Sequence, residues 1–356
     1  MQSATSIEAV SLLYEPDVQP VIGVSGRTVR FLNLAARNLF GDIQPGTAIR
    51  RLLPEHVAQH QSSAFFATAK IKAHTYCVTL SSMPGLRIFR LEPVRRDTPF
   101  WHMVAPSDLF SMELGLSSAY FSAIAAEQED LTFRHHAARL ERTADQLRRW
   151  VNNVRTLQTL CQGGAHPVER IVDCASLLAA ILETVQPLLD RRGIRFALTL
   201  PESPCYVRLT PEYFETMVLN FISNAVKNCA DGAVISINLM RATRTAHLII
   251  HDNGAGFQEG VLTDVFHAYC AGELPNTDQP HAGYGLPTCF AVAEDLGGAL
   301  LIESSRGHGA AIHVILPLCA SVKSTLRSSD VPPECASPAL CRVGISDALS
   351  EEDYLS

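Results

Sequence analysis

Hydrophobic and polar positions follow three different patterns along the chain. Between residues 12 and 95, short apolar runs alternate with turn residues, which predicts strands such as 28–32 and 86–94 around a short helix. Between 107 and 161, apolar residues recur at spacings of four and three, which is typical of packed helices. From 168 to 320, helix-like and strand-like segments alternate. The chain is therefore predicted to be a multidomain α+β protein.

The helical region carries its clearest seam in its second half. The seam residues have heptad spacing and are Leu140, Ala144, Leu147, Val151 and Val154. A weaker seam precedes them, and the charged stretch Glu127–Arg134 would form the turn, with Thr132 as the N-cap of the second helix. We predict a two-helix hairpin over residues 99–165 that dimerises into a four-helix bundle. An ordinary helical linker is the alternative.

The third region, 166–320, is predicted to be a layer of helices on a mixed sheet. The expected helices are Ala175–Arg192, Pro211–Cys229 and Leu286–Leu296, and the expected strands are Ile194–Leu200, Val234–Met240, Ala246–Asp252, Ala299–Ser304 and Ala311–Pro317. Residues 321–356 are predicted to be a flexible tail, because their first part is rich in Ser, Pro and Cys. Its last part, Ile345–Leu355, could form a short acidic helix that docks on this domain or on a partner.

Composition narrows the functional classes. An apolar content of 47% excludes wholesale disorder, and a net charge of −7 without a basic patch argues against a nucleic-acid partner. The longest uncharged stretches are about half of the 18–20 residues that a membrane span needs, and the start of the chain lacks a signal-peptide pattern. The ten cysteines include no C-x-x-C pair, so reduced thiols in a cytoplasmic protein are expected.

Three groups of residues in the third region carry candidate chemistry. The first lies on the predicted helix 211–229, where spacings of four and three put Asn220, Asn224 and Lys227 on one face. An amide oxygen is a suitable ligand for Mg²⁺, and a lysine one turn further on can meet phosphate oxygens. Taken alone, a helix with two solvated amides and a surface lysine would explain the pattern equally well.

The second group, Asp252, Gly254 and Gly256, directly follows a predicted strand. A carboxylate there can accept a hydrogen bond from an exocyclic amine, and the glycines let the backbone approach a flat ring. In the third group, Gly283, Gly285 and Leu286 open a helix, whose bare N–H groups favour a phosphate. The long loop 272–283 before it is typical of a lid. Each group by itself could be an ordinary turn.

The order and spacing of these groups, with the closing strand that ends at Pro317, resemble the ATPase domain of histidine kinases, within the wider family that includes DNA gyrase, Hsp90 and MutL. The resemblance spans residues 166–320 and implies that ATP and Mg²⁺ are the cofactors. By this resemblance, Asn224 would hold Mg²⁺, Lys227 would face the phosphates and Asp252 would recognise adenine. The other implied ATP-binding residues are Asn220, Gly254, Gly256, Gly283, Gly285 and Leu286.

The first region and the hairpin extend the resemblance. The order of elements in residues 12–98 is similar to a PAS sensor domain, where a hairpin opens the fold and three more strands close it. In histidine kinases the first hairpin helix carries the phosphoacceptor, commonly in a Ser-His-Glu-Leu-Arg-Thr-Pro-Leu pattern. Here the matching stretch begins at Ser111, with Met112 in place of the histidine and Glu113 as the retained carboxylate, a candidate base. A thioether cannot replace imidazole as a phosphoryl acceptor.

The sequence therefore predicts a cytoplasmic, ATP-binding protein of two-component signal transduction that is similar to a sensor histidine kinase but lacks the usual acceptor. It would form a homodimer and bind a response regulator or another signalling protein, with no nucleic acid and no membrane span. The alternative is a competent kinase that autophosphorylates on His135 or His136 and passes the phosphate to a response regulator.

Overall fold

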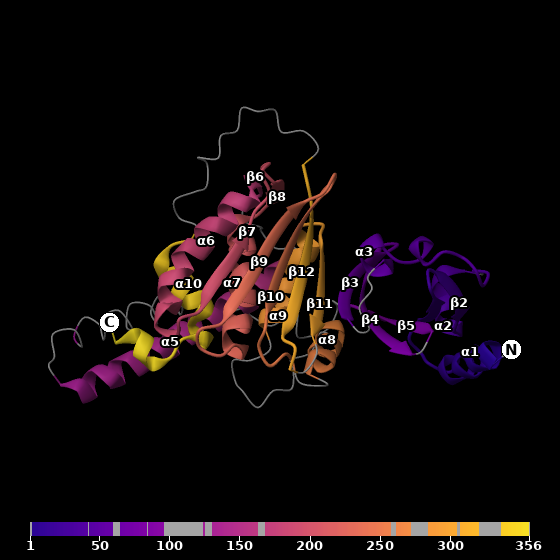
Figure 1. The fold of residues 1–356 in the computed structure, drawn as a ribbon, viewed down its shortest axis with the longest axis horizontal. Coiled ribbons are helices and arrows are strands. Elements are labelled where there is room, and N and C mark those ends of the chain that lie inside the picture. The colour runs from indigo at the N-terminus through magenta and orange to yellow at the C-terminus, as the bar shows by residue number, and fades with distance from the viewer. Residues whose placement is uncertain are drawn as a thin grey trace.

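The described part of the chain forms two α+β units that share one sheet (Figure 1). No helix within this part is both long and apolar enough to cross a membrane. The computed structural model describes residues 2–41, 43–59, 65–83, 85–95, 124, 130–162, 168–257, 261–271, 284–304, 307–319 and 336–355.

The N-terminal unit is an antiparallel sheet of order β2-β1-β5-β4-β3 with short helices. Its elements are α1 (Gln2–Tyr14), β1 (Val21–Ser25), β2 (Thr28–Leu32), α2 (Leu34–Phe40), η1 (Ile49–Arg51), α3 (Glu55–Ala58), β3 (Phe65–Ile71), β4 (His74–Met83) and β5 (Leu86–Pro93). The opening hairpin, α2 and strands β4 and β5 confirm the strands and the short helix that the sequence predicts for this region. The sequence did not predict α1 or β3.

The second unit confirms the expected layer of helices on a mixed sheet. Its elements are β6 (Arg170–Asp173), α6 (Cys174–Leu189), η3 (Asp190–Arg192), β7 (Arg195–Thr199), β8 (Tyr206–Leu209), α7 (Pro211–Asn228), β9 (Val234–Arg241), β10 (Thr245–Asp252), α8 (Val261–Ala271), α9 (Gly285–Asp295), β11 (Ala299–Ser304) and β12 (Ala310–Pro317). Its main strands follow the order β11-β12-β10-β9-β7, and only β7 and β9 run parallel. The short strands β6 and β8 pair separately.

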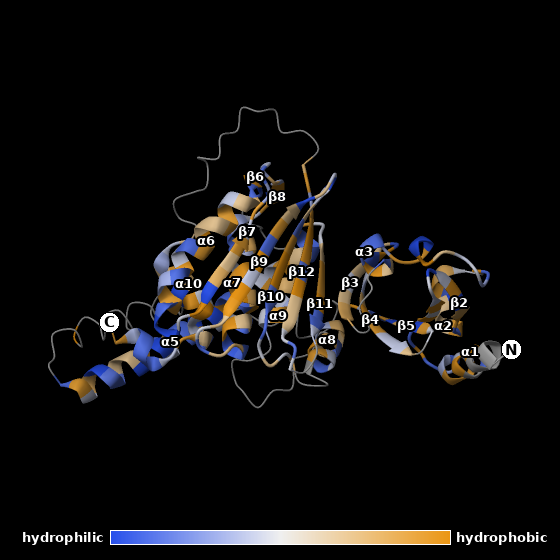
Figure 2. Cartoon of the chain, viewed as in Figure 1, coloured by the Kyte–Doolittle hydropathy of each residue, from blue (hydrophilic) through white to orange (hydrophobic). Residues whose placement is uncertain are grey.

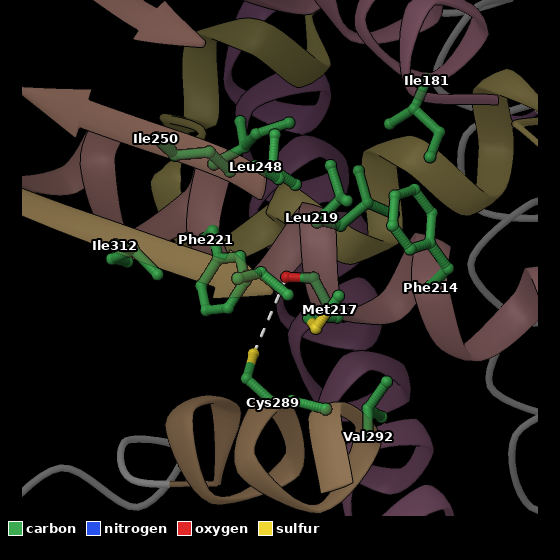
Figure 3. Packing of buried hydrophobic residues seen from close by; sticks show 14 of the residues in the cluster. Ile181, Phe214, Met217, Leu219, Phe221, Leu248, Ile250, Cys289, Val292 and Ile312 are labelled. Atoms are coloured by element: carbon green, nitrogen blue, oxygen red, sulfur yellow. Dashed lines mark hydrogen bonds between the residues drawn. The ribbon is translucent and has the colours of Figure 1, made fainter. Parts of the chain in front are cut away.

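The core of this unit lies between the sheet and helices α6, α7 and α9. Met217 and Phe221 of α7 are fully buried together with Cys289 of α9 and Leu248 of β10, as Figure 3 shows. The Cys289 thiol donates to the Met217 carbonyl at 3.7 Å, so α7 and α9 lie in direct contact. Hydrophobic residues follow the facing surfaces of helices and strands in Figure 2. This packing fixes the position of α7, which carries the first group of candidate residues.

The two units meet edge to edge, because β3 pairs antiparallel with β11 and completes a ten-stranded sheet. Leu301 stands opposite Ala67 in this pairing. Beside the pair, the Phe66 ring lies 4.8 Å from the Phe266 ring of α8. The Arg95 N–H donates to the carbonyl of Cys270 at 2.7 Å. The N-terminal unit therefore contacts α8, the last described element before residues 272–283.

Helix α5 (Leu131–Gln162) corresponds to the second helix of the expected hairpin. The expected first helix lies outside the described residues. Asp130, not Thr132, caps α5, because the Asp130 carboxylate accepts from the Thr132 N–H at 2.8 Å. Within the expected seam, Val151 and Val154 are buried, whereas Leu140 is 53% exposed. The four-helix bundle therefore stays a prediction.

Residues 336–355, which we call the C-terminal segment, are folded and packed. The prediction of a flexible tail is therefore wrong for them, whereas the suggested docking of Ile345–Leu355 on the ATPase domain is confirmed. The segment contains α10 (Pro338–Ile345), η4 (Ser346–Ala348) and η5 (Glu351–Tyr354). Ser337 caps α10 by accepting from the Leu340 N–H. The physical reason for the docking is apolar burial, since Cys341, Ile345 and Leu349 are almost completely enclosed.

Candidate functional site

The site is built along one face of α7. Pro211 at the first turn and Glu212 beside it favour the helix start, and Lys227 in the last turn complements the helix dipole. The helix places Asn220, Asn224 and Lys227 on one face, as their spacing predicts. Asn220 is buried, Asn224 is half-buried and Lys227 is exposed, so this face becomes more open toward the end of the helix.

The loop after β10 is held against the C-terminal end of α7. The Gly254 N–H donates to Asp252 Oδ1 at 2.9 Å, and the Ala255 N–H donates to the Asn228 carbonyl at 3.1 Å. A Cβ at position 254 would lie 2.2 Å from the Asn228 oxygen, so only glycine permits this approach. The second group of candidate residues therefore meets the first.

Asp252 is 6% exposed, and this burial raises the pKa of its carboxyl. The hydrogen bond from the Gly254 N–H opposes the shift. On the other side, a Cβ at Gly309 would lie 1.9 Å from the Asp252 carbonyl oxygen, and Gly309 has a φ of +76°. Gly256 also adopts a positive φ, +68°. Glycines thus bring the backbone close to Asp252, at its carboxylate from Gly254 and at its own carbonyl from Gly309.

The third group reaches α7 at Asn220. Gly285 begins α9, and a Cβ there would lie 3.0 Å from Asn220 Oδ1. Leu286 is buried behind it. Gly283 and the rest of the expected lid fall outside the described residues. The structure therefore brings together all three groups at the positions it describes, with α7 as their common support.

Asn220 differs from its expected role. Its amide is 2% exposed and faces α5 instead of an open site. Asn220 Oδ1 accepts from Arg149 Nη2 at 2.8 Å and from Asn153 Nδ2 at 3.2 Å, while Asn220 Nδ2 donates to Asn153 Oδ1 at 2.9 Å. With both ends of the amide engaged in this way, Asn220 connects α7 to α5.

Lys227 is also engaged within the chain. Its Nζ donates to Asp347 Oδ2 of the C-terminal segment at 3.2 Å, and the same carboxylate oxygen pairs with the guanidinium of Arg149. Burial lowers the pKa of Arg149, and the charge of Asp347 opposes this shift. For Asn224, no side-chain hydrogen bond is present among the residues that the structure describes. Its amide oxygen suits a hard cation such as Mg²⁺.

Residues 210–320 match the family model of the histidine kinase-, DNA gyrase B- and HSP90-like ATPase. The adaptive-response sensory kinase SasA of Synechococcus sp. (strain JA-3-3Ab) is 26% identical over 184 residues, which cover 50% of this chain and 48% of that protein. Sporulation kinase D of Bacillus subtilis (strain 168) is 27% identical over 149 residues, or 40% and 28% of the two chains. Residues 210–320 are therefore an ATPase domain of this family, and the chain is similar to sensor histidine kinases.

The match to these kinases is partial in length. The chain spans about half of the first relative and less than a third of the second. Among solved structures, the histidine kinase AdeS of Acinetobacter baumannii aligns with a TM-score of 0.41 and 16% identity, covering 58% of this chain and 95% of that one. The matched family model covers α7, the Asp252 loop and α9, so the described candidate groups all lie within the ATPase domain.

Three residues beside the site were not expected from the sequence: Arg149, Asn153 and Asp347. A signal for the first two was present on α5. Four polar residues of α5 recur at a spacing of four and form a second stripe beside the heptad seam. All of them are less than 9% exposed: Glu141, Asp145, Arg149 and Asn153. A polar stripe that is buried needs partners, which here come from α7 and the C-terminal segment.

The phosphoacceptor candidates expected from the sequence are only partly described by the structure. Met112 and Glu113 lie outside the described residues. His135 and His136 lie in the first two turns of α5, and both are exposed. The structure therefore leaves their imidazoles accessible, and Met112 and Glu113 stay predictions from the sequence.

Proposed function

We propose that this histidine kinase-like chain binds Mg-ATP for two-component signalling and lacks the usual phosphoacceptor. The observation that carries the proposal is the meeting of the candidate groups on α7. Gly254 approaches the Asn228 carbonyl at one end, and Gly285 approaches Asn220 nearer the middle. Residues far apart in sequence are thereby held along one helix, which supports a common site for a nucleotide.

The proposed roles follow from the chemistry at each end. The Asp252 carboxylate, buried at the end of β10, accepts a hydrogen bond from the adenine amine, and Gly254 and Gly256 let the base lie close to the backbone. Lys227 faces the phosphates. The Asn224 oxygen would hold Mg²⁺, which neutralises phosphate charge when bound. Gly283, Gly285 and Leu286 form the base of the proposed lid.

The proposed defect is at the acceptor. Autophosphorylation needs an imidazole nitrogen in line with the γ-phosphate and a carboxylate to orient it. Met112 offers a thioether in that position, which leaves Glu113 as a base without its acceptor. In this proposal the chain signals by nucleotide-dependent binding to a response regulator or another signalling protein.

A second candidate function is favoured by the exposure of His135 and His136. If one of them accepts the γ-phosphate, the chain is a competent kinase that passes the phosphoryl group to an aspartate of a response regulator. Both histidines lie near the start of α5 with exposed side chains, which is what an acceptor requires.

Two further parts of the proposal concern assembly. The strand order β2-β1-β5-β4-β3, with a hairpin first and three strands after it, supports a PAS-like sensor role for residues 12–98. The heptad seam over residues 140–154 supports a homodimer formed through the hairpin 99–165. Cross-linking of the full chain at rising concentration would test the second point.

The deciding experiment is incubation of the full chain with Mg²⁺ and γ-labelled ATP, beside Asp252→Asn and Met112→His variants. We expect no acid-labile label on the wild type, which nevertheless binds ATP in a separate titration. Label on Met112→His would show that the remaining machinery works. Label on the wild type that Asp252→Asn abolishes would support the second candidate. Absence of ATP binding would overturn the proposal.

A further inference from the structure

The C-terminal segment lies across the part of α7 that leads to Lys227. Helix α10 packs so closely that a Cβ at Gly344 would lie 2.5 Å from Leu219 Cδ1. At the start of the segment, the Ala336 N–H donates to Glu215 Oε2 of α7 at 3.2 Å. The segment is therefore held on α7 by both apolar packing and a buried hydrogen bond.

A second set of contacts holds the same segment on α5. Arg342 pairs with Glu141 at 2.6 Å and with Asp145 at 3.0 Å. The Tyr354 hydroxyl donates to Asp145 Oδ2 at 3.3 Å, and the Arg134 guanidinium donates to the Leu355 carbonyl at 2.9 Å. Because the segment packs against both α5 and α7, the position of η4 and of its Asp347 carboxylate is fixed.

That carboxylate, Asp347, lies between two cations. Lys227 comes from α7 and is partly exposed, whereas the Arg149 side chain comes from α5 and is only 8% exposed. Asn220 orients the guanidinium by accepting from its second nitrogen. A buried cation requires an anion beside it, so Arg149 and Lys227 together define a place for a negatively charged oxygen.

We propose that Arg149 and Lys227 form one phosphate-binding site for the nucleotide, and that the Asp347 carboxylate fills this site until a nucleotide displaces it. The inference rests on the proposed function, because that proposal assigns Lys227 to the phosphates. Arg149 then becomes a binding residue that α5 contributes to the ATPase domain, and Asn220 becomes its positioning residue.

The consequence is competition that depends on phosphate. Lys227 cannot pair fully with Asp347 and with a phosphate oxygen, so docking of η4 and binding of a triphosphate oppose each other. By linkage, a ligand that displaces Asp347 also loosens the C-terminal segment by the same free energy. Adenosine has no phosphate and gains nothing from displacement. ATP would thereby uncover the apolar side chains Ile345 and Leu349, which are now buried.

The test is calorimetric titration of the full chain with ATP and with adenosine, both with Mg²⁺. Asp347→Asn removes the competing charge with little change of shape, so ATP should bind about tenfold more tightly and adenosine within about twofold of the wild type. Glu352→Gln is the matched control, since Glu352 also pairs with an arginine (Arg191, 2.7 Å) but far less buried. Its affinities should match the wild type.

Two further variants separate the parts of the inference. Gly344→Leu displaces α10 from Leu219 while keeping Asp347, and it should tighten ATP binding in the same way. Arg149→Gln should weaken ATP binding without affecting adenosine. Hydrogen exchange over residues 336–355 should rise when ATP is added to the wild type but not when adenosine is added. Thermal unfolding of each variant verifies that it is folded.

The outcomes distinguish the two proposals. If wild type and Asp347→Asn bind ATP equally, the competition is wrong and the proposed nucleotide site stands. If Asp347→Asn tightens adenosine as much as ATP, the effect does not involve phosphate and the inference is overturned. If ATP binds to none of the folded variants, the proposed function itself fails.

Discussion

The two ends of the site on α7 are built in opposite ways. At the Asp252 end, backbone and glycine residues form the walls, and the short sequence 252–256 supplies most of the geometry. At the Lys227 end, side chains from three distant segments meet, namely Arg149 of α5, Lys227 of α7 and Asp347 of the C-terminal segment. The first end is shaped by the backbone, and the second already holds an anion of its own chain.

This difference indicates how the two ends respond to change. A preformed backbone site loses its shape when a glycine gains a side chain, and the loss appears as reduced stability. A site made of charged side chains keeps its fold when one of them is changed, but its preference among ligands shifts. Perturbations of the two ends should therefore differ in kind.

The largest effect should come from Gly309→Ala at the Asp252 end. The new Cβ would lie 1.9 Å from the Asp252 carbonyl oxygen, in a backbone with a φ of +76°. Overpacking and the left-handed conformation together should lower the free energy of unfolding by about 3 kcal/mol. Urea denaturation measures this loss, and adenosine binding should disappear with it.

Gly307→Ala is the matched control for this substitution. Gly307 has a similar φ of +80°, but apart from its chain neighbours no atom of the described residues lies within 4 Å of the position of its Cβ. The variant should therefore show only the conformational cost of about 1 kcal/mol. Equal losses for the two glycines would mean that close packing against Asp252 does not shape this end of the site.

The second effect is loss of base recognition in Asp252→Asn. Replacing the carboxylate removes a charge-assisted hydrogen bond, so the affinities for ATP and adenosine should both fall about 30-fold. The protein should remain folded, because the amide oxygen can still accept from the Gly254 N–H. Calorimetry checks both ligands. If only the ATP affinity fell, Asp252 would act on the phosphates, and the Asp252 and Lys227 ends would not differ in the part of the nucleotide that they bind.

The sequence was sufficient for the elements whose formation is local. Helix α7 shows both its termini in its own residues, with Pro211 at the start and Lys227 in the last turn. The spacing of Asn220, Asn224 and Lys227 on a helix dictates their common face. Asp252 follows an alternating strand, β10, and the glycines after it explain the turn. For this reason the ATPase domain could be predicted closely from the sequence.

The remaining features depend on which surfaces meet, and no local pattern determines that. The pairing of β3 with β11 joins strands from separate units. The sequence of an edge strand does not specify which other strand it pairs with. The C-terminal segment follows a run rich in Ser and Pro, and its sequence is compatible both with a flexible tail and with a docked end. The contacts of Asn220 with α5 also could not be read from the sequence. The heptad seam of α5 indicates only where its apolar face lies, and it does not show that the polar stripe with Arg149 packs against α7.

The third effect tests the Lys227 end. Lys227→Gln should weaken ATP binding about fivefold and leave adenosine unchanged. The change is smaller than for Asp252, because losing the lysine also loosens Asp347, its competitor. Lys70→Gln, at an exposed position on β3, is the control for loss of a positive charge. Equal weakening of adenosine would show that Lys227 supports the base, and the two ends would then not be separate.

The smallest effect concerns pH and returns to the Asp252 end. Burial raises the pKa of this carboxyl, so its proton should bind at a higher pH than on an ordinary aspartate as the solution is acidified. A protonated carboxyl accepts poorly from the adenine amine, and adenosine affinity should decline in that window. Adenosine is the appropriate ligand because it carries no titrating phosphate. Asp252→Asn should abolish the decline.

The same shift has a consequence for stability with a definite sign. A pKa raised by folding means that the native state favours the protonated carboxyl, so its stabilising contribution is complete below the unfolded-state pKa and is lost as pH rises through the native one. Of the nearby groups, Cys229 is uncharged in this range, and a positive charge on His251 would reduce the shift. At neutral pH, Asp252→Asn should therefore be at least as stable as the wild type, with the difference closing under acid. Urea titrations at several pH values measure it. A variant less stable at neutral pH would show that the buried carboxylate is stabilised by its hydrogen bonds more than it is penalised by burial.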